Sequence, residues 1–269
     1  MNAAGASKLM RSIKMKKTKR SNSLRYSFAL LLILLNPIAA VFAQDTLFTQ
    51  LDPKGEKVGY EIEKKDVTTE KGILINGKKS GLIRSYFANG VLQSSKEYQN
   101  DMKNGWSMEC ESNGVVIKEE NYKNGVLDGE VRTYYTSKGI RILKSSYNYK
   151  DGIYDGVCKE YNDMGKLVSL ATYKQGIKDG ISQWYYQSGL LAMEQTYKDG
   201  LLSGKQTTWN QSGNVTAAGS YANNMRNGPW KEYHENGKLM AEGEYQDDKK
   251  YGTWKYYDTD GSFVKNETY

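Results

Sequence analysis

The strongest constraint on the fold is a glycine that recurs at nearly constant spacing through most of the chain. The interval is 24 residues in every case but one, where it is 27. These repeat glycines are Gly81, Gly105, Gly129, Gly156, Gly180, Gly204, Gly228 and Gly252. A second glycine follows nine residues after each of them, or ten in the third copy. Self-similarity at a short fixed period indicates an array of small structural units. The sequence therefore predicts eight copies of one unit across residues 81–269.

Two aromatic positions recur with the glycines. The residue five places after the repeat glycine is Tyr or Trp in seven copies and Cys110 in the second. Each copy then closes on a tyrosine, and these closing tyrosines are Tyr98, Tyr122, Tyr149, Tyr173, Tyr197, Tyr221, Tyr245 and Tyr269.

Each copy carries the pattern of a β-hairpin. In the seventh copy, "WKEYHE" and "KLMAEGEY" alternate apolar with polar residues and are separated by "ENG". A three-residue loop that ends in a left-handed glycine places the fifth-position aromatic on the same face as the leucine that follows it, such as Leu239. We expect the closing tyrosine to join them there and form the core face. Positions two, four and six would then make up the opposite, outer face.

Between copies, a Gly, Asn or Asp three residues after the closing tyrosine predicts a second tight reversal. The predicted fold is all-β: an elongated antiparallel meander of consecutive hairpins in one twisted open sheet. Its roughly 16 strands at about 4.8 Å each would extend about 75 Å. Residues 44–80 are less regular, and we read them as a divergent hairpin that caps the first edge of the array.

The pattern resembles the MORN repeat in its bacterial variant form, most clearly in "NGPWKEYHENGKLMAEGEYQDDKKYGTWKYYDTDG". Tryptophan stands at the second position only in Trp230 and Trp254, so most copies depart from the pattern there. The resemblance implies β-hairpin repeats, a role in holding other molecules together and no catalytic residue. Members of that family are often labelled antitoxins.

Residues 1–43 have the three parts of a secretory signal peptide. Eight Lys/Arg and no acidic residue are followed by the apolar run "FALLLILL" and the small-residue exit "AAVFAQ". The apolar run is too short to span a membrane stably, so we expect cleavage after Ala43, with translation starting at Met1 or Met15.

The remaining 226 residues hold 30 Lys+Arg against 31 Asp+Glu. The formal charge of +7 therefore comes from the predicted signal peptide, and no nucleic-acid partner is expected.

The side chains that could carry chemistry are scattered. His234, the single histidine, occupies a position that varies freely between copies, so we expect a solvated surface residue. Cys110 and Cys158 fall on separate strands and opposite faces, which predicts two unpaired thiols. The sequence presents no nitrogen–sulfur ligand set for a metal and no phosphate-binding loop. We expect a protein that is not an enzyme and has no cofactor.

Function is therefore sought on the predicted outer face, where exposed aromatics among polar residues suit contact with a partner. The candidate binding residues are Phe87, Tyr135, Trp184, Tyr186, Trp230, Trp254 and Tyr256. The alternative is that these rings only pack along the sheet. The leading hypothesis is an exported scaffold for protein partners in the bacterial envelope, periplasmic or secreted. A second is carbohydrate or cell-wall binding, suggested by "GTWKYYDTDGS" at Gly252–Ser262. A third, an antitoxin-like neutraliser, rests on the family label.

Overall fold

The chain forms one long antiparallel sheet of consecutive hairpins, as the repeat predicts. The computed structural model describes residues 59–64 and 68–269, and the predicted signal peptide lies outside them. Every regular element in the described residues is a strand. The strands are β1 (Gly59–Lys64), β2 (Thr68–Ile75), β3 (Lys78–Phe87), β4 (Leu92–Gln99), β5 (Met102–Cys110), β6 (Val116–Lys123), β7 (Val126–Leu127), β8 (Gly129–Ser137), β9 (Ile140–Lys150), β10 (Ile153–Tyr154), β11 (Gly156–Tyr161), β12 (Leu167–Lys174), β13 (Ile177–Tyr185), β14 (Leu191–Lys198), β15 (Leu201–Trp209), β16 (Val215–Ala222), β17 (Met225–Tyr233), β18 (Leu239–Gln246), β19 (Lys249–Tyr257) and β20 (Phe263–Thr268).

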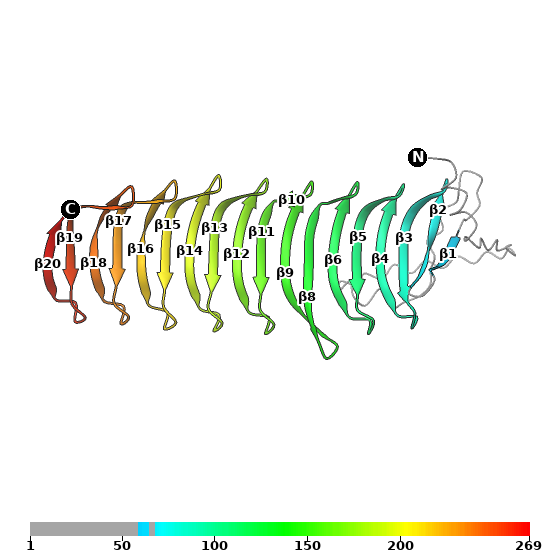
Figure 1. The fold of residues 1–269 in the computed structure, drawn as a ribbon, viewed down its shortest axis with the longest axis horizontal. Coiled ribbons are helices and arrows are strands. Elements are labelled where there is room, and N and C mark those ends of the chain that lie inside the picture. The colour runs from blue at the N-terminus through cyan, green and yellow to red at the C-terminus, as the bar shows by residue number, and fades with distance from the viewer. Residues whose placement is uncertain (1–58, 65–67) are drawn as a thin grey trace, which may run out of the picture.

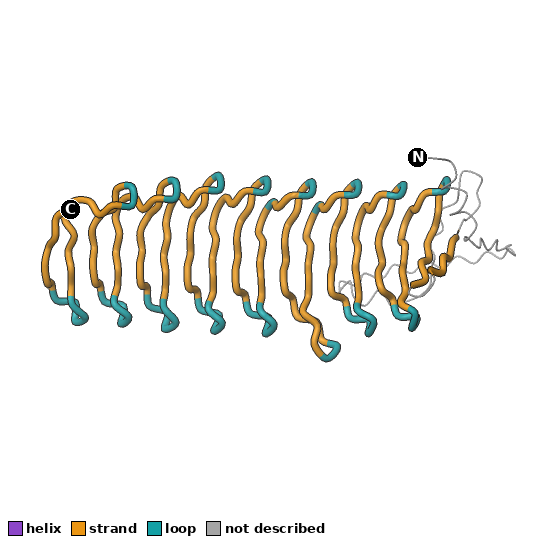
Figure 2. The backbone as a smooth tube through the Cα atoms, in the orientation of Figure 1, coloured by secondary structure: helices purple, strands orange, loops and turns teal. Residues whose placement is uncertain are grey.

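All of these strands belong to a single sheet that does not close on itself (Figure 1). The short strands β7 and β10 continue into β8 and β11, so each copy contributes one hairpin. The loops within copies lie along one long edge, and the turns between copies lie along the other (Figure 2). Before the first copy, β1 and β2 pair antiparallel, which provides a hairpin within the region predicted to cap the array.

The loop within each regular copy has the predicted geometry. In the seventh copy, Gly237 has φ of 84° and donates its N–H to the carbonyl of His234, while the His234 N–H bonds to Lys238. This leaves a three-residue loop ending in a left-handed glycine. The third copy differs, because its strands pair up to Ser137 and Ile140 around a two-residue turn. Its three additional residues therefore lengthen the hairpin, which projects beyond its neighbours in Figure 2.

A β-bulge after each loop changes which residues share a face. Tyr233 pairs with Leu239, but its neighbour Glu232 pairs with Ala241, so Met240 is an extra residue without a partner. Alternation beyond the bulge is reversed by this one residue. Tyr233 and Leu239 share a face, as predicted, but the closing Tyr245 lies on the other one. The prediction that the closing tyrosine joins the fifth-position aromatic is wrong.

We call the side with the closing tyrosines and positions two and four the ladder face, and the side with the fifth-position aromatics the reverse face. The most buried cluster lies on the ladder face and consists of Trp230, Ala241, Tyr245 and Trp254. Tyr245 stands between the two indoles, 5.6 and 5.1 Å from their ring centroids. The face predicted to be outer therefore contains this core cluster.

The repeat glycines lie at a second irregularity, within the first strand of each hairpin. Between the pairs Gly219–Trp230 and Tyr221–Arg226, one residue of β16 faces three residues of β17. Gly228 lies in this bulge with φ of 93°, a conformation in which a side chain is strained. The recurrence of glycine at this position follows from that backbone shape.

The turns between copies bond back to the start of the same copy. Asp248 donates its N–H to the Arg226 carbonyl at 3.1 Å and accepts the Arg226 N–H on Oδ1 at 2.9 Å. The same pair of bonds joins Asp101 to Lys79 in the first copy. Asp247 and Asp248 both have positive φ, as a two-residue turn of this hand requires. This acidic pair therefore serves turn structure.

Candidate functional site

The ladder face carries a row of tyrosines interleaved with cations. A Lys or Arg two residues before the repeat glycine lies over the closing tyrosine of its own copy in five copies. The nearest contacts are Arg226 at 4.0 Å from the Tyr245 centroid and Lys103 at 4.2 Å from that of Tyr122. The other three are Lys79 over Tyr98, Lys178 over Tyr197 and Lys250 over Tyr269. Cation–π contacts thus link the two strands of a hairpin on this face.

The fourth copy replaces this cation with an aromatic ring. Tyr154 occupies the position, and its ring lies 4.9 Å from Tyr149 and 5.2 Å from Tyr173. It also meets the ring of Tyr147 edge-on at 5.5 Å. The third and sixth copies carry Leu127 and Leu202 at this position. The fourth copy therefore has a cluster of tyrosines where most copies seat an ammonium or guanidinium group.

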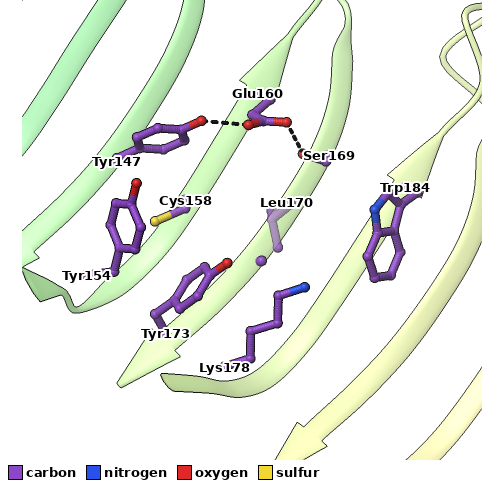
Figure 3. A pocket seen from close by; sticks show the side chains of 10 residues that line it. Tyr147, Tyr154, Cys158, Glu160, Ser169, Leu170, Tyr173, Lys178 and Trp184 are labelled. Atoms are coloured by element: carbon purple, nitrogen blue, oxygen red, sulfur yellow. Dashed lines mark hydrogen bonds between the residues drawn. The ribbon is translucent and has the colours of Figure 1, made fainter. Parts of the chain in front are cut away.

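A groove opens beside this tyrosine cluster. Two adjoining cavities of about 270 and 330 Å³ share Tyr147 and Glu160. The first is drawn in Figure 3 and is lined by Tyr147, Tyr154, Cys158, Glu160, Ser169, Leu170, Ala171, Tyr173, Lys178 and Trp184. The second is lined by Tyr135, Lys144, Ser145, Tyr147, Glu160, Tyr161, Asn162 and Val168. Together they make a continuous groove across the third, fourth and fifth copies.

Glu160 stands at the junction of the two cavities and is exposed. It accepts hydrogen bonds from the Tyr147 hydroxyl at 2.6 Å and the Ser169 hydroxyl at 3.0 Å (Figure 3). Burial and the bond to Glu160 raise the pKa of Tyr147, so the phenol stays protonated and keeps donating. No ion pair to Glu160 occurs within residues 68–269, whereas Glu109 pairs with Lys96 at 2.7 Å. The groove therefore presents a carboxylate held in place by neutral donors.

Cys158 forms part of the groove wall, and its chemistry is limited. Burial raises the pKa of its thiol, and the thiolate is the reactive form. Both cysteines of the chain are free, as predicted, and both are buried. In the described residues, no group of three or more His, Cys, Asp and Glu side chains is arranged to hold a metal ion. The arrangement suits non-covalent binding by rings, hydroxyls and one carboxylate.

Of the seven predicted binding residues, the structure places two in the groove and five elsewhere. Trp184 and Tyr135 line the groove, one in each cavity. The prediction that Trp230 and Trp254 are exposed is wrong, because they are 5% and 0% exposed in the core cluster. Tyr256 packs against that cluster. Phe87 and Tyr186 begin hairpin loops and are half-buried, and the Tyr186 hydroxyl bonds to the Trp209 carbonyl of the next copy.

His234 is also less exposed than predicted. It is half-buried, and its Nε2 lies 3.0 Å from the carbonyl oxygen of Tyr257 in the next copy. The contact repeats the one made by Tyr186. Sixth-position side chains can therefore tie adjacent loops together, which explains a histidine there without catalysis.

Sequence reasoning missed most of the groove, namely Tyr147, Tyr154, Glu160, Tyr173 and Lys178. Tyr173 was assigned to the other face because the bulge was not foreseen. Tyr154 could have been found by aligning the copies, since it interrupts a column of cations. This departure distinguishes the fourth copy from the five copies that carry a cation at the same position.

Comparison with known proteins agrees with the repeat. The MORN repeat variant matches residues 79–100, 154–175, 178–199 and 226–247. Each match starts two residues before a repeat glycine and ends in the next turn between copies, so it covers one structural hairpin. No curated protein matches the chain. Among the residues described, no helix has the length and apolar character needed to cross a bilayer. The matches lie on four of the eight hairpins of one sheet, and the chain belongs to the MORN repeat variant family.

Proposed function

We propose that this chain is a non-catalytic binding protein that holds a partner protein against the ladder face, with the groove over β8–β13 as the main contact. Repeats of this family generally bind proteins or membranes. The observation that carries the proposal is the groove itself, because it is concave, rimmed with aromatic rings and supplied with one free carboxylate. Such concave sites with a few placed polar groups are typical of binding surfaces.

The architecture supports a partner that is larger than the groove. The sheet presents one continuous face, and each copy adds a small strip of it. Aromatic residues such as Tyr135 and Trp184 at the groove can act as anchors, while neighbouring strips exclude water. Affinity would then depend on several copies at once.

The test is capture of a partner from an envelope extract with residues 44–269 as bait. Ala171 lies in the groove wall, and the preceding copy has Tyr147 at the equivalent place, so Ala171→Tyr fills the groove with a residue that the repeat accepts. The matched control is Ala218→Tyr on the reverse face, since Ala218 adjoins Gly219 in β16 and points the other way. A protein captured by the wild type and the control but lost with Ala171→Tyr supports the proposal. Equal capture by all three contradicts it.

Export to the periplasm or beyond is part of this proposal and rests on the sequence of residues 1–43. The basic lead, short apolar run and small-residue exit favour removal by signal peptidase. The mature protein should begin at Gln44, which mass spectrometry of the purified envelope or secreted protein would show. An intact N-terminus on protein from the cytoplasm would overturn this assignment.

Carbohydrate binding is the second candidate, but a different part of the chain now supports it. The stretch Gly252–Ser262 that suggested it holds Trp254, which is fully buried. The groove favours it instead, because rings beside Glu160 and Ser169 suit stacking and hydrogen bonding to a sugar. Tryptophan fluorescence of the protein titrated with envelope polysaccharides tests this candidate, and no response would remove it. The antitoxin role rests on the family label, and a neighbouring toxin gene would be its support.

A further inference from the structure

We infer that the corner of the groove formed by Tyr147, Tyr154, Tyr173 and Glu160 binds a Lys or Arg side chain of the partner protein. The inference rests on the proposed function and names the chemistry that this site recognises. It starts from the repeat itself, in which five copies place their own Lys or Arg against the tyrosines of this face.

The first step is the missing internal cation. In the fourth copy, Tyr154 takes the cation's place, and its ring sits between Tyr149 and Tyr173 at 4.9 and 5.2 Å. Rings gathered around a cavity expose negative π-faces, and such faces attract an ammonium or guanidinium group. The fourth copy thus gathers rings of the kind that carry an internal cation in five other copies, and it has no cation of its own at that position.

The second step is the carboxylate. Glu160 accepts bonds from two hydroxyls and has no cationic partner within the described residues. A carboxylate can accept further hydrogen bonds, and a charged donor forms the stronger ones. An incoming Lys or Arg would meet rings on one side and Glu160 on the other, which is the combination found in aromatic cages for organic cations.

The two lysines that line the groove are already placed elsewhere. Lys178 Nζ lies 5.4 Å from the Trp184 ring and 5.0 Å from that of Tyr197, on the side of the fifth copy. Lys144 Nζ lies 5.3 Å from the Tyr135 ring, in the second cavity. Lys178 is the cross-strand partner of Tyr173. Both ammonium groups lie over rings outside the Tyr154–Glu160 corner, which leaves that corner to the partner. An anionic ligand between the two lysines is the competing occupant.

The probe is N-acetyl-lysine methylamide, titrated into residues 44–269 and followed by NMR. The neutral analogue N-acetyl-norleucine methylamide, which lacks the ammonium group, and the anionic N-acetyl-glutamate methylamide serve as comparisons. The lysine probe should bind about tenfold more tightly than the norleucine probe. Equal binding of those two, or tighter binding of the glutamate probe, overturns the inference.

The repeat supplies the decisive variant, Tyr154→Lys, which restores the cation found in five other copies. It should keep the fold and weaken binding of the lysine probe by at least about tenfold, because the internal ammonium occupies the cage. The matched control, Leu202→Lys, makes the same kind of change four strands away on the same face and should leave binding unchanged. Glu160→Gln removes the carboxylate charge with little change in shape and should also weaken binding. Unchanged binding in both Tyr154→Lys and Glu160→Gln overturns the inference.

The same variants separate this inference from the proposed function. If Ala171→Tyr abolishes partner capture while Tyr154→Lys does not, the groove binds a protein but this corner does not recognise a basic side chain. If the lysine probe binds this corner but no partner depends on Ala171, the cation site stands and the proposed function fails.

Discussion

The indole of Trp230 lies directly against the backbone of Gly219. A Cβ placed on Gly219 would be 1.9 Å from Cε3 of that ring. The contact is repeated one copy later, where a Cβ on Gly243 would be 2.5 Å from Trp254. In other copies the residues at these two positions are Ala171 opposite Ser182 and Gln195 opposite Gln206. A glycine in one copy therefore accommodates the indole of the next copy at these two strand pairs.

Gly219→Ala should lower the free energy of unfolding by about 1–3 kcal/mol, because the methyl group overpacks a rigid ring. In a Trp230→Ser background the same change should cost much less, since it recreates the pair Ala171–Ser182. Urea unfolding of the four proteins in this cycle measures the coupling. Additive effects of the two substitutions would show that the ring and the glycine do not depend on each other.

The turn residue Asp248 should be replaceable by glycine but not by alanine. Its φ is 65°, and four of the other turns between copies have glycine in its place. Both substitutions remove the acceptor of the Arg226 N–H, but only alanine must adopt a left-handed backbone. We expect Asp248→Ala to be less stable than Asp248→Gly by about 1 kcal/mol in thermal or urea unfolding. Equal stability would mean that the turn conformation costs nothing here.

Alkaline pH should destabilise the array through its half-buried tyrosines. Burial and the nearby Glu120 raise the pKa of Tyr122 from 10.0 to about 12, and burial with a hydrogen bond to Glu119 does the same for Tyr134. The folded state thus favours the neutral phenols. Their contribution is complete below pH 10 and is lost as the pH rises through about 12.

Urea unfolding at steps through this range, with phenolate absorbance, measures the effect. Tyr122→Phe cannot ionise at that position, so its alkaline loss of stability should be smaller than that of the wild type. A pH dependence identical to the wild type would assign the loss to other groups.

The array itself could be predicted from the sequence, because glycine spacing and alternation determine hairpins, loops and turns locally. The position of the core could not. A three-residue loop ending in Gly237 correctly places Tyr233 beside Leu239, yet Met240 then enters as an extra residue and reverses the alternation before Tyr245. A bulge of this kind leaves no distinct residue type in the sequence, so periodicity alone assigns the closing tyrosine to the wrong face.

The groove was only partly predictable for the same reason. Trp184 and Tyr135 could be predicted because aromatic residues at outer-face positions are evident in the sequence. Tyr154 and Glu160 could not, because their role in the groove depends on contacts with residues of other strands. Trp230 and Trp254 were assigned to the surface because a small opposing residue, such as Gly243, gives no local sign that a ring covers it. The burial of these two tryptophans is determined by packing across strands, which the local sequence does not show.

Site-specific photo-crosslinking tests the central claim most directly, because it reports which face the partner touches. A photoreactive side chain at Val168, which is 38% exposed and lines the groove, is compared with one at Ile181, which is 46% exposed on the reverse face. In envelope extracts, a discrete crosslinked partner should form from position 168 and not from position 181. Crosslinking from position 181 alone, or equally from both positions, would contradict the assignment of the groove as the binding surface.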